Sequence, residues 1–190
     1  VRLCILGIMA GFCIALGYLA FIRITGTAPT EWGSFNNFLG GALFPVGLIA
    51  LTFVGGELAT GNMMVMTLGV LQKKVRVGAL CYNWLVVLLT NCLGGFLVAY
   101  LFGHIVGLTE GAFLDKTVAV AQAKIADPPI VAFVSGIGCN IFVCLAVYLG
   151  ALAKSYLGKM FGLWFPVMVF VVCGFQHVVA NAFIIPAAIF

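Results

Sequence analysis

A histidine stands within an apolar stretch that is otherwise long enough to cross a lipid bilayer. The stretch reads FPVMVFVVCGFQHVVAN from Phe165 to Asn181, and Gly174 interrupts it just before Gln176 and His177. Glycine lets a helix stop and restart at little steric cost. Backbone groups freed at such a break must line a cavity or lie within protein, because lipid cannot hydrogen-bond them. Polar residues at the break therefore predict a transport site, where an imidazole with an unperturbed pKa of about 6.5 can hold and release a proton.

An earlier stretch has the same pattern. It reads FPVGLIALTFVGGELATGN from Phe44 to Asn62, and upstream of it GIMAGFCIALGYL resembles the later GIGCNIFVCLAVYL. The corresponding residues are Gly55 and Gly174, Glu57 and Gln176, Leu58 and His177, Thr60 and Val179, and Asn62 and Asn181. We interpret this similarity as an internal repeat with two broken helices.

The composition identifies the class of protein. Of the 190 residues, 64% are hydrophobic and only 7% are charged, which is too much apolar surface for a soluble domain to bury. We therefore predict one polytopic, all-α transmembrane domain over residues 1–190. The chain begins without Met, next to Arg2, and ends on the apolar Phe190, so we expect it to be trimmed at both ends.

Hydropathy predicts five crossings, of which the first, Leu3–Ile22, matches a hydrocarbon thickness of about 30 Å. They are Leu3–Ile22, the broken segment Phe38–Leu71, Gly78–Phe102, Ile130–Leu152 and the broken segment Leu163–Phe190. Polar loops are expected over residues 25–37 and 109–129. The glycines Gly7, Gly11, Gly94 and Gly95 suit close helix packing.

The basic residues predict the orientation. Six of the nine fall on one side, namely Arg2, Lys73, Lys74, Arg76, Lys154 and Lys159, and the other side holds Arg23, Lys116 and Lys124. This bias places the N-terminus in the cytoplasm. If the repeat unit is three spans, the halves enter the membrane from opposite sides as an inverted repeat, and a sixth helix follows Phe190.

In this arrangement the second halves of both broken helices direct their N-termini at the membrane centre, near Thr60 and His177. Helix N-termini carry unpaired N–H groups and partial positive charge, so two of them facing one point predict an anion site. The alternative is that Thr60, Asn62 and Asn181 only cap and join helices, and that His177 is a core residue. We expect the ring to rest neutral and to accept a proton more readily beside an anion. Glu57 is expected to accept backbone N–H bonds that hold its glycine loop.

Three stretches resemble the formate/nitrite transporter family of pentameric channels with an aquaporin-like fold. They are GGALFPVGLIALTFVGGELATGN, GIGCNIFVCLAVYL and GFQHVVANAFIIP, and the resemblance extends over essentially all 190 residues. It implies that His177 is the central pore histidine and Thr60 its hydroxyl partner. It also implies that Asn181 and Asn140 are polar pore and vestibule residues, and that Lys124 lies near the outer pore.

The resemblance further implies apolar constrictions above and below the histidine, formed by Phe44, Leu48, Leu58 and Phe170. Apolar rings of this kind reject hydrated ions by dewetting. The helix breaks would be shaped by Gly55, Gly56, Glu57, Gly174 and Gln176. The family often has an acidic residue just before the histidine, and Gln176 departs from that pattern.

The expected function is passage of a small monovalent anion together with a proton through a homopentamer in a prokaryotic inner or plasma membrane. Formate is the first candidate, and nitrite, hydrosulfide and lactate remain open. No enzyme activity, cofactor, metal or nucleic-acid partner is expected, and the seven cysteines are interpreted as small core residues. A rival class is a membrane haem or redox protein that uses His104 and His177, although His104 lies near the end of its span. Water conduction is a second rival, but neither break holds an Asn-Pro-Ala box.

Overall fold

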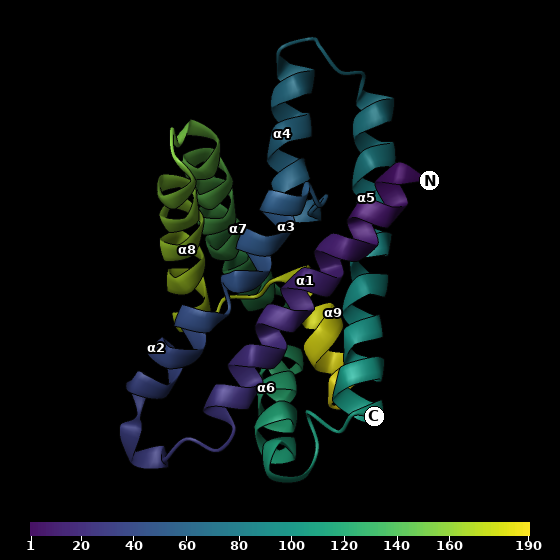
Figure 1. Cartoon of the computed structure of the whole chain (residues 1–190). Coiled ribbons are helices and arrows are strands. Elements are labelled where there is room, and N and C mark those ends of the chain that lie inside the picture. The colour runs from purple at the N-terminus through teal and green to yellow at the C-terminus, as the bar shows by residue number, and fades with distance from the viewer.

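The structure is a computed structural model that describes every residue from Val1 to Phe190, and it consists of helices and connections without strands (Figure 1). In chain order the helices are α1 (Arg2–Thr25), η1 (Thr30–Trp32), α2 (Ser34–Leu43), α3 (Val46–Val54), α4 (Ala59–Leu71), α5 (Val77–Val98), the π-helix η2 (Ala99–Ile105), η3 (Gly111–Phe113), α6 (Leu114–Ala126), α7 (Pro129–Leu152), α8 (Tyr156–Val172) and α9 (Val178–Ala187). The predicted all-α class is confirmed.

Four helical segments are long and apolar enough to cross a membrane. They are Arg2–Thr25, Ser34–Val54, Val77–Ile105 and Pro129–Leu152. Each coincides with a predicted crossing, or with the first part of one in the case of Ser34–Val54. The fifth predicted crossing is divided between α8 and α9, which are shorter apolar helices.

One expected loop is wrong. Residues 109–129 were expected to be a polar loop, but most of them form α6, which packs against α9. Thr117 and Ala121 are buried along one side of α6, at the spacing of one helical turn. At 13 residues, with Asp115, Lys116 and Lys124 among them, α6 is too short and too charged for hydropathy to indicate it as a crossing.

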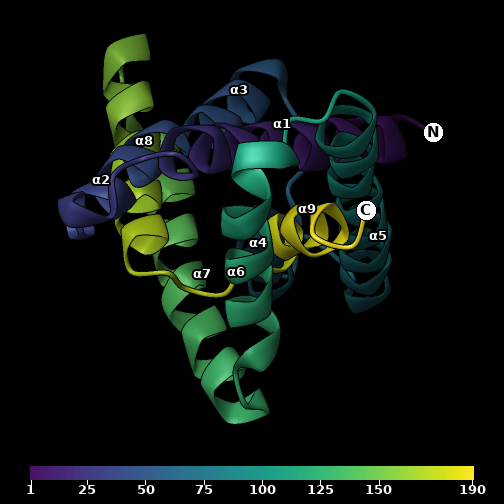
Figure 2. The ribbon, with the colours of Figure 1, turned by 90° about the horizontal axis from the view of Figure 1, so that it is seen from below.

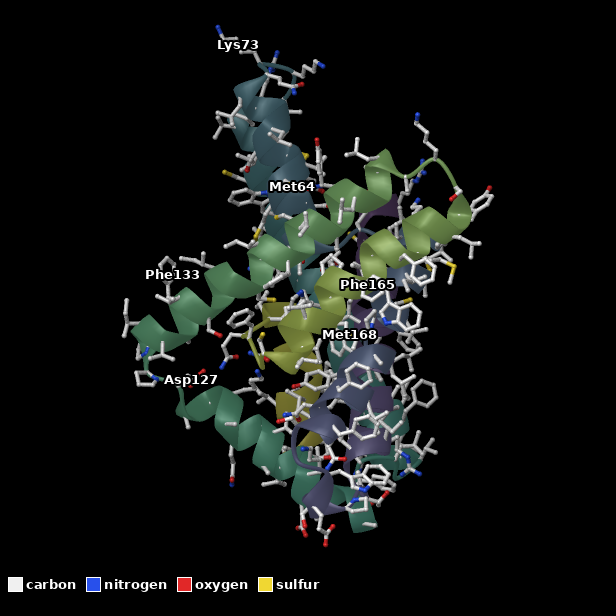
Figure 3. The ribbon with its side chains drawn as sticks, turned by 90° about the vertical axis from the view of Figure 1, so that its left-hand side faces the viewer. Met64, Lys73, Asp127, Phe133, Phe165 and Met168 are labelled. Atoms are coloured by element: carbon white, nitrogen blue, oxygen red, sulfur yellow. The ribbon has the colours of Figure 1, made fainter.

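The two ends of the molecule differ in charge. We call one end the basic face: it holds Val1, the α4–α5 connection with Lys73 at its tip, and the α7–α8 connection (Figures 1 and 3). The opposite face holds the α1–α2 and η2–α6 connections. Helix α1 runs away from the basic face and α7 runs toward it (Figure 1). The grouping of basic residues therefore agrees with the predicted one, and the compartment that each face meets stays a prediction.

Helix α1 is central to the packing, and it contacts α5, α3, α2 and α9 (Figure 2). Its contact with α5 is close because glycines meet there. A Cβ atom added at Gly11 would overlap the backbone of Asn91, and one added at Gly94 would overlap the backbone of Ile8. The predicted role of these glycines in helix packing is thus confirmed.

Two breaks divide the helices that lead to the site. Gly55 ends α3 with φ 75° and Gly174 follows α8 with φ 71°, a left-handed conformation that glycine adopts without a Cβ penalty. After the breaks, α4 runs toward the basic face and α9 toward the opposite face (Figure 1). Both helices begin about midway between the two faces (Figure 1).

Candidate functional site

The N-termini of α4 and α9 meet at Thr60 and His177. Thr60 Oγ1 lies 3.5 Å from His177 Nε2, and the two residues are only 1% and 3% exposed. The sequence separates them by 117 positions, so the contact depends on both breaks ending at the same depth. The structure thus brings together the two residues that the sequence predicted as the centre of the site.

His177 also caps the helix that it precedes. Its Nδ1 accepts a hydrogen bond from the backbone N–H of Ala180 at 3.1 Å. A backbone N–H can only donate, so Nδ1 carries no proton and the neutral ring holds its proton on Nε2. This tautomer directs an N–H donor toward Thr60. The ring is stacked on Phe170, with 5.7 Å between the ring centroids.

The two breaks share a side-chain clamp. Asn62 donates to Glu57 Oε2 at 2.7 Å, and Asn181 donates to Gln176 Oε1 at 2.7 Å, with the same five-residue separation in each pair. These four residues are two of the corresponding pairs in the repeat. Glu57 was expected to accept backbone N–H bonds, and that expectation is wrong, because its carboxylate binds the Asn62 amide instead. The structural role expected for Glu57 nevertheless fits this contact.

The sequence reasoning missed Asn91, which holds the first break in place. Its side chain is fully buried; Oδ1 accepts from Ala59 N–H at 2.8 Å, while Nδ2 donates to the backbone oxygens of Gly7 and Glu57 at 2.7 and 2.8 Å. One amide therefore ties α1, α5 and the start of α4 together. The available signal was an uncharged polar residue in the middle of the apolar span of residues 78–102.

The second break is held by a network from α6. The Lys124 ammonium donates to the backbone oxygens of Gly174 and Phe175 at 2.6 and 3.1 Å. The Gln176 amide donates to Lys124 O at 3.1 Å and to Asp127 Oδ2 at 2.7 Å. Asp127 lies where α6 meets α7 (Figure 3). Burial lowers the pKa of Lys124, and the charge of Asp127 opposes this shift.

Because both acceptors of the Gln176 amide are oxygens, the orientation of this side chain is fixed. Its Oε1 must face Asn181, and Asn181 must turn its Nδ2 toward it. The remaining oxygen, Asn181 Oδ1, is buried and has no hydrogen-bond partner in the chain. Asn181, which lines the same cavity as His177, thus has a free hydrogen-bond acceptor and no free donor facing Gln176.

Two cavities lie on either side of the Thr60–His177 contact. The His177 cavity, about 340 Å³, opens toward the opposite face, and the Lys159 cavity, about 230 Å³, lies toward the basic face. Lining residues of the His177 cavity include Phe44, Lys116, Lys124, Phe170, His177 and Asn181. The Lys159 cavity is lined among others by Leu48, Leu51, Leu58, Asn62, Val147 and Lys159.

The four residues predicted as constrictions are distributed between these cavities. Phe44 and Phe170 line the His177 cavity with their rings 5.8 Å apart, while Leu48 and Leu58 line the Lys159 cavity. All four are at most 4% exposed. They are buried apolar residues on both sides of the polar contact, and their role as constrictions, which the resemblance implies, stays a prediction.

Two other predicted residues lie elsewhere. Asn140 lines a separate cavity of about 780 Å³ that it shares with Asn181, and its amide donates to Gly136 O in its own helix at 2.8 Å. His104 pairs with Glu110 at 3.0 Å at the end of η2 and does not line the His177 cavity. The structure therefore does not join His104 and His177 in one site.

The cysteines do not behave as one group. All seven are free thiols, but only Cys139 is buried, and Cys81 and Cys173 are exposed. The expectation that they are core residues is wrong for the two exposed thiols, whereas Cys139 lies in the core and Cys13 packs against it. No group of three potential metal-ligating side chains is present.

Comparison with known proteins gives a consistent result. The family model described as Formate/nitrite transporter matches residues 1–190. An uncharacterized transporter, YrhG of Bacillus subtilis (strain 168), is 52% identical over 99% of this chain and 71% of its own length. The formate channel BtFdhC of Bacillus thuringiensis is 47% identical over 98% of this chain and 72% of its own.

Solved structures agree with the sequence matches. A structure described as "Pentameric formate channel with formate bound" superposes with a TM-score of 0.89 at 30% identity, and the match covers 99% of this chain and 74% of that one. A second structure, described as "FNT family ion channel", gives a TM-score of 0.90 at 27% identity over 98% of this chain and 73% of that one.

Proposed function

Because the chain belongs to the formate/nitrite transporter family, we propose that it carries a small monovalent anion, formate first, across the membrane through the Thr60–His177 contact. The relatives and solved structures are channels and transporters, so the chain is an integral membrane transport protein and not an enzyme. The observation that carries the proposal is the convergence of two helix N-termini on one buried polar contact.

The charge distribution at this contact favours an anion. Helices α4 and α9 both direct the positive ends of their dipoles toward it, and their first N–H groups lie nearby. The proton on His177 Nε2 adds a donor directed into the same space. The 3.5 Å separation between Nε2 and Thr60 Oγ1 is long for a hydrogen bond, so an oxygen of a permeating ion can replace that contact.

A proton lowers the free energy that an anion needs to cross the apolar layers. An ion that crosses between Phe44, Phe170, Leu48 and Leu58 must shed its water, which costs several kcal/mol for a bare charge. A proton transferred to the anion, or held beside it on His177, removes most of that cost. Protonation of the ring requires Nδ1 to release the Ala180 N–H, a cap bond worth about 1 kcal/mol, and the charge of the adjacent anion offsets this loss.

Assembly and orientation follow from the same reasoning. We propose a homopentamer, because a matched solved structure is a pentameric formate channel. Apolar side chains on α7 such as Phe133, Ile137 and Ile141 are exposed in the single chain and suit lipid or a neighbouring subunit. We further propose a prokaryotic inner or plasma membrane with the basic face in the cytoplasm.

The test is uptake of formate, nitrite, hydrosulfide and lactate by proteoliposomes that contain the full-length protein, measured between about pH 5 and pH 8. We expect formate uptake to rise as pH falls and to move little net charge. The His177→Asn variant can still cap α9 through its side-chain oxygen but cannot titrate, so it should lose the pH dependence and keep its assembly. His177→Phe, which loses the cap as well, is the companion variant.

The proposal for the histidine is rejected if His177→Asn keeps the wild-type pH profile for formate. Uptake of nitrite, hydrosulfide or lactate at a higher rate than formate would keep the channel and change its substrate. No uptake of any of the four anions by an assembled wild-type protein would reject the transport proposal as a whole.

A further inference from the structure

The Lys159 cavity is lined by a lysine whose ammonium makes no ion pair with a carboxylate of the chain. The one ion pair within 4 Å is between His104 and Glu110, and the Lys159 ammonium makes no hydrogen bond. The side chain is partly buried, with its stem beside Gly150 and its Nζ 5.2 Å from the centroid of the Phe53 ring. A cation held over a ring face keeps its N–H donors available.

Lys124 makes a useful comparison. It borders the cavity on the other side of the Thr60–His177 contact, but its ammonium already donates to two backbone oxygens at the second break. Lys124 therefore combines a charge with a structural task. Lys159 lines its cavity, and its ammonium makes no hydrogen bond to the backbone or to another side chain.

The side-chain donors of the other polar residues that line the Lys159 cavity already make hydrogen bonds within the chain. Thr52 Oγ1 donates to Leu48 O at 2.6 Å, and the Asn62 amide donates to Glu57 and Asn83 at 2.7 and 3.0 Å. No carboxylate lines the cavity, and Glu57 accepts from the Asn62 amide through Oε2. Lys159 is thus the available donor and the positive charge next to the apolar layer of Leu48 and Leu58.

We propose that the Lys159 cavity is an anion-binding site at the basic-face entrance, which holds a small monovalent oxyanion such as formate before it crosses the Leu48–Leu58 layer. The identity of the anion rests on the proposed transport function. A positive group in a low-dielectric recess raises the local concentration of anions and offsets part of the dehydration cost. A cavity of about 230 Å³ has room for an anion of three or four heavy atoms with water.

Lys154 provides a matched control. It lies on the same α7–α8 connection side as Lys159, is exposed, and does not line the cavity. Removal of either lysine lowers the positive charge of the basic face by one unit, so both variants should have the same effect on membrane orientation. Only Lys159→Gln removes a cation from the entrance itself.

The first measurement is formate uptake by sealed membrane vesicles of both orientations that contain the full-length protein. We expect Lys159→Gln to raise the half-saturating formate concentration about threefold or more when the basic face meets the added formate. The opposite orientation should be unaffected, and Lys154→Gln should match the wild type in both. Uptake of formamide, a neutral molecule of similar size, should not change.

The second measurement does not require transport. The purified protein is treated with an amine-reactive reagent, and the labelling rates of Lys159 and Lys154 are read by mass spectrometry with and without formate. Formate should slow labelling of Lys159 about threefold and leave Lys154 unchanged, and formamide should protect neither.

These results separate the two proposals. If formate protects Lys159 but the wild type transports no formate, the transport proposal fails and the binding site stands. If the wild type transports formate but Lys159 is labelled equally with and without it, the site is rejected alone. Equal half-saturation in Lys159→Gln and Lys154→Gln would also reject the site.

Discussion

The two helix breaks have the same scaffold but differ at the residue just before the helix that restarts. Each has a left-handed glycine, a clamp between residues five apart, and a helix that starts at mid-height. The residue before the second helix is Leu58 in one break and His177 in the other. This difference shows that the scaffold accepts an apolar or a titratable side chain, so the chemistry depends on a position that the scaffold does not dictate.

The breaks also differ in how the helix start is satisfied. Leu58 cannot cap α4, and the N–H of Ala59 is instead bound by Asn91 from α5. His177 caps α9 itself through Nδ1. At the first break Asn91 binds the helix start and Thr60 faces the polar contact. At the second break His177 does both. Substitutions at the two breaks can test that division.

The largest effect is expected from Asn91→Ala. The substitution leaves the backbone oxygen of Glu57 and the N–H of Ala59 without their side-chain partner in a buried place, at a cost of about 1–3 kcal/mol each, and removes one bond to Gly7 O, which keeps its partner within α1. We expect a total loss of about 3 kcal/mol or more, seen as a lower thermal midpoint and poor recovery of assembled protein. A midpoint equal to the wild type would show that the first break does not depend on the remote cap.

A smaller effect is expected from Gln176→Glu, which makes the second break resemble the first. The introduced carboxylate cannot donate to Asp127, whose Oδ2 now lies 2.7 Å from the Gln176 amide, so two carboxylates meet at a distance where both cannot ionise freely. We expect a loss of about 2 kcal/mol at pH 8.

The pH dependence of this variant has a defined sign. Repulsion raises the pKa of one introduced or neighbouring carboxyl in the folded protein, so the folded state binds a proton more readily than the unfolded state. Stability relative to the wild type should therefore recover as pH falls toward about 5. Thermal midpoints of both proteins across this range check it, and a gap that widens at low pH would contradict the Asp127–Gln176 contact.

The smallest effect is expected from Glu57→Gln, the reciprocal change. The glutamine oxygen can still accept from Asn62, and no carboxylate lies against it as Asp127 lies against Gln176. We expect a change of about 0.5 kcal/mol or less in stability. A loss as large as that of Gln176→Glu would mean that the charge of Glu57, and not only its acceptor, holds the first break.

The sequence could predict much of this arrangement because its signals are local. Apolar runs, the glycines at 55 and 174, and the repeat around Glu57 and Gln176 all lie within single segments. The convergence of the two helix starts near Thr60 and His177 followed from the predicted topology, whereas the pairing of the two side chains followed from the family resemblance. The remaining contacts could not be predicted in this way.

The missed contacts depend on tertiary packing. Asn91 is one of two asparagines in an apolar span, and only the crossing of α1 and α5 reveals its three partners. Likewise, α6 buries only Thr117 and Ala121, so its packing against α9 and the Asp127–Gln176 bond leave no clear periodic signal. The cap made by His177 Nδ1 depends on a ring orientation that no pattern encodes.

The glycine contact between α1 and α5 has a mechanical consequence. With no side chain between the two backbones at Gly11 and Gly94, this pair has almost no free volume and little room to slide. Under lateral pressure from the bilayer, α1 and α5 should therefore move together as one rigid body. Any change in the bore of the passage must then come from the other wall, where α3 and α8 contact each other through side chains that can change rotamer.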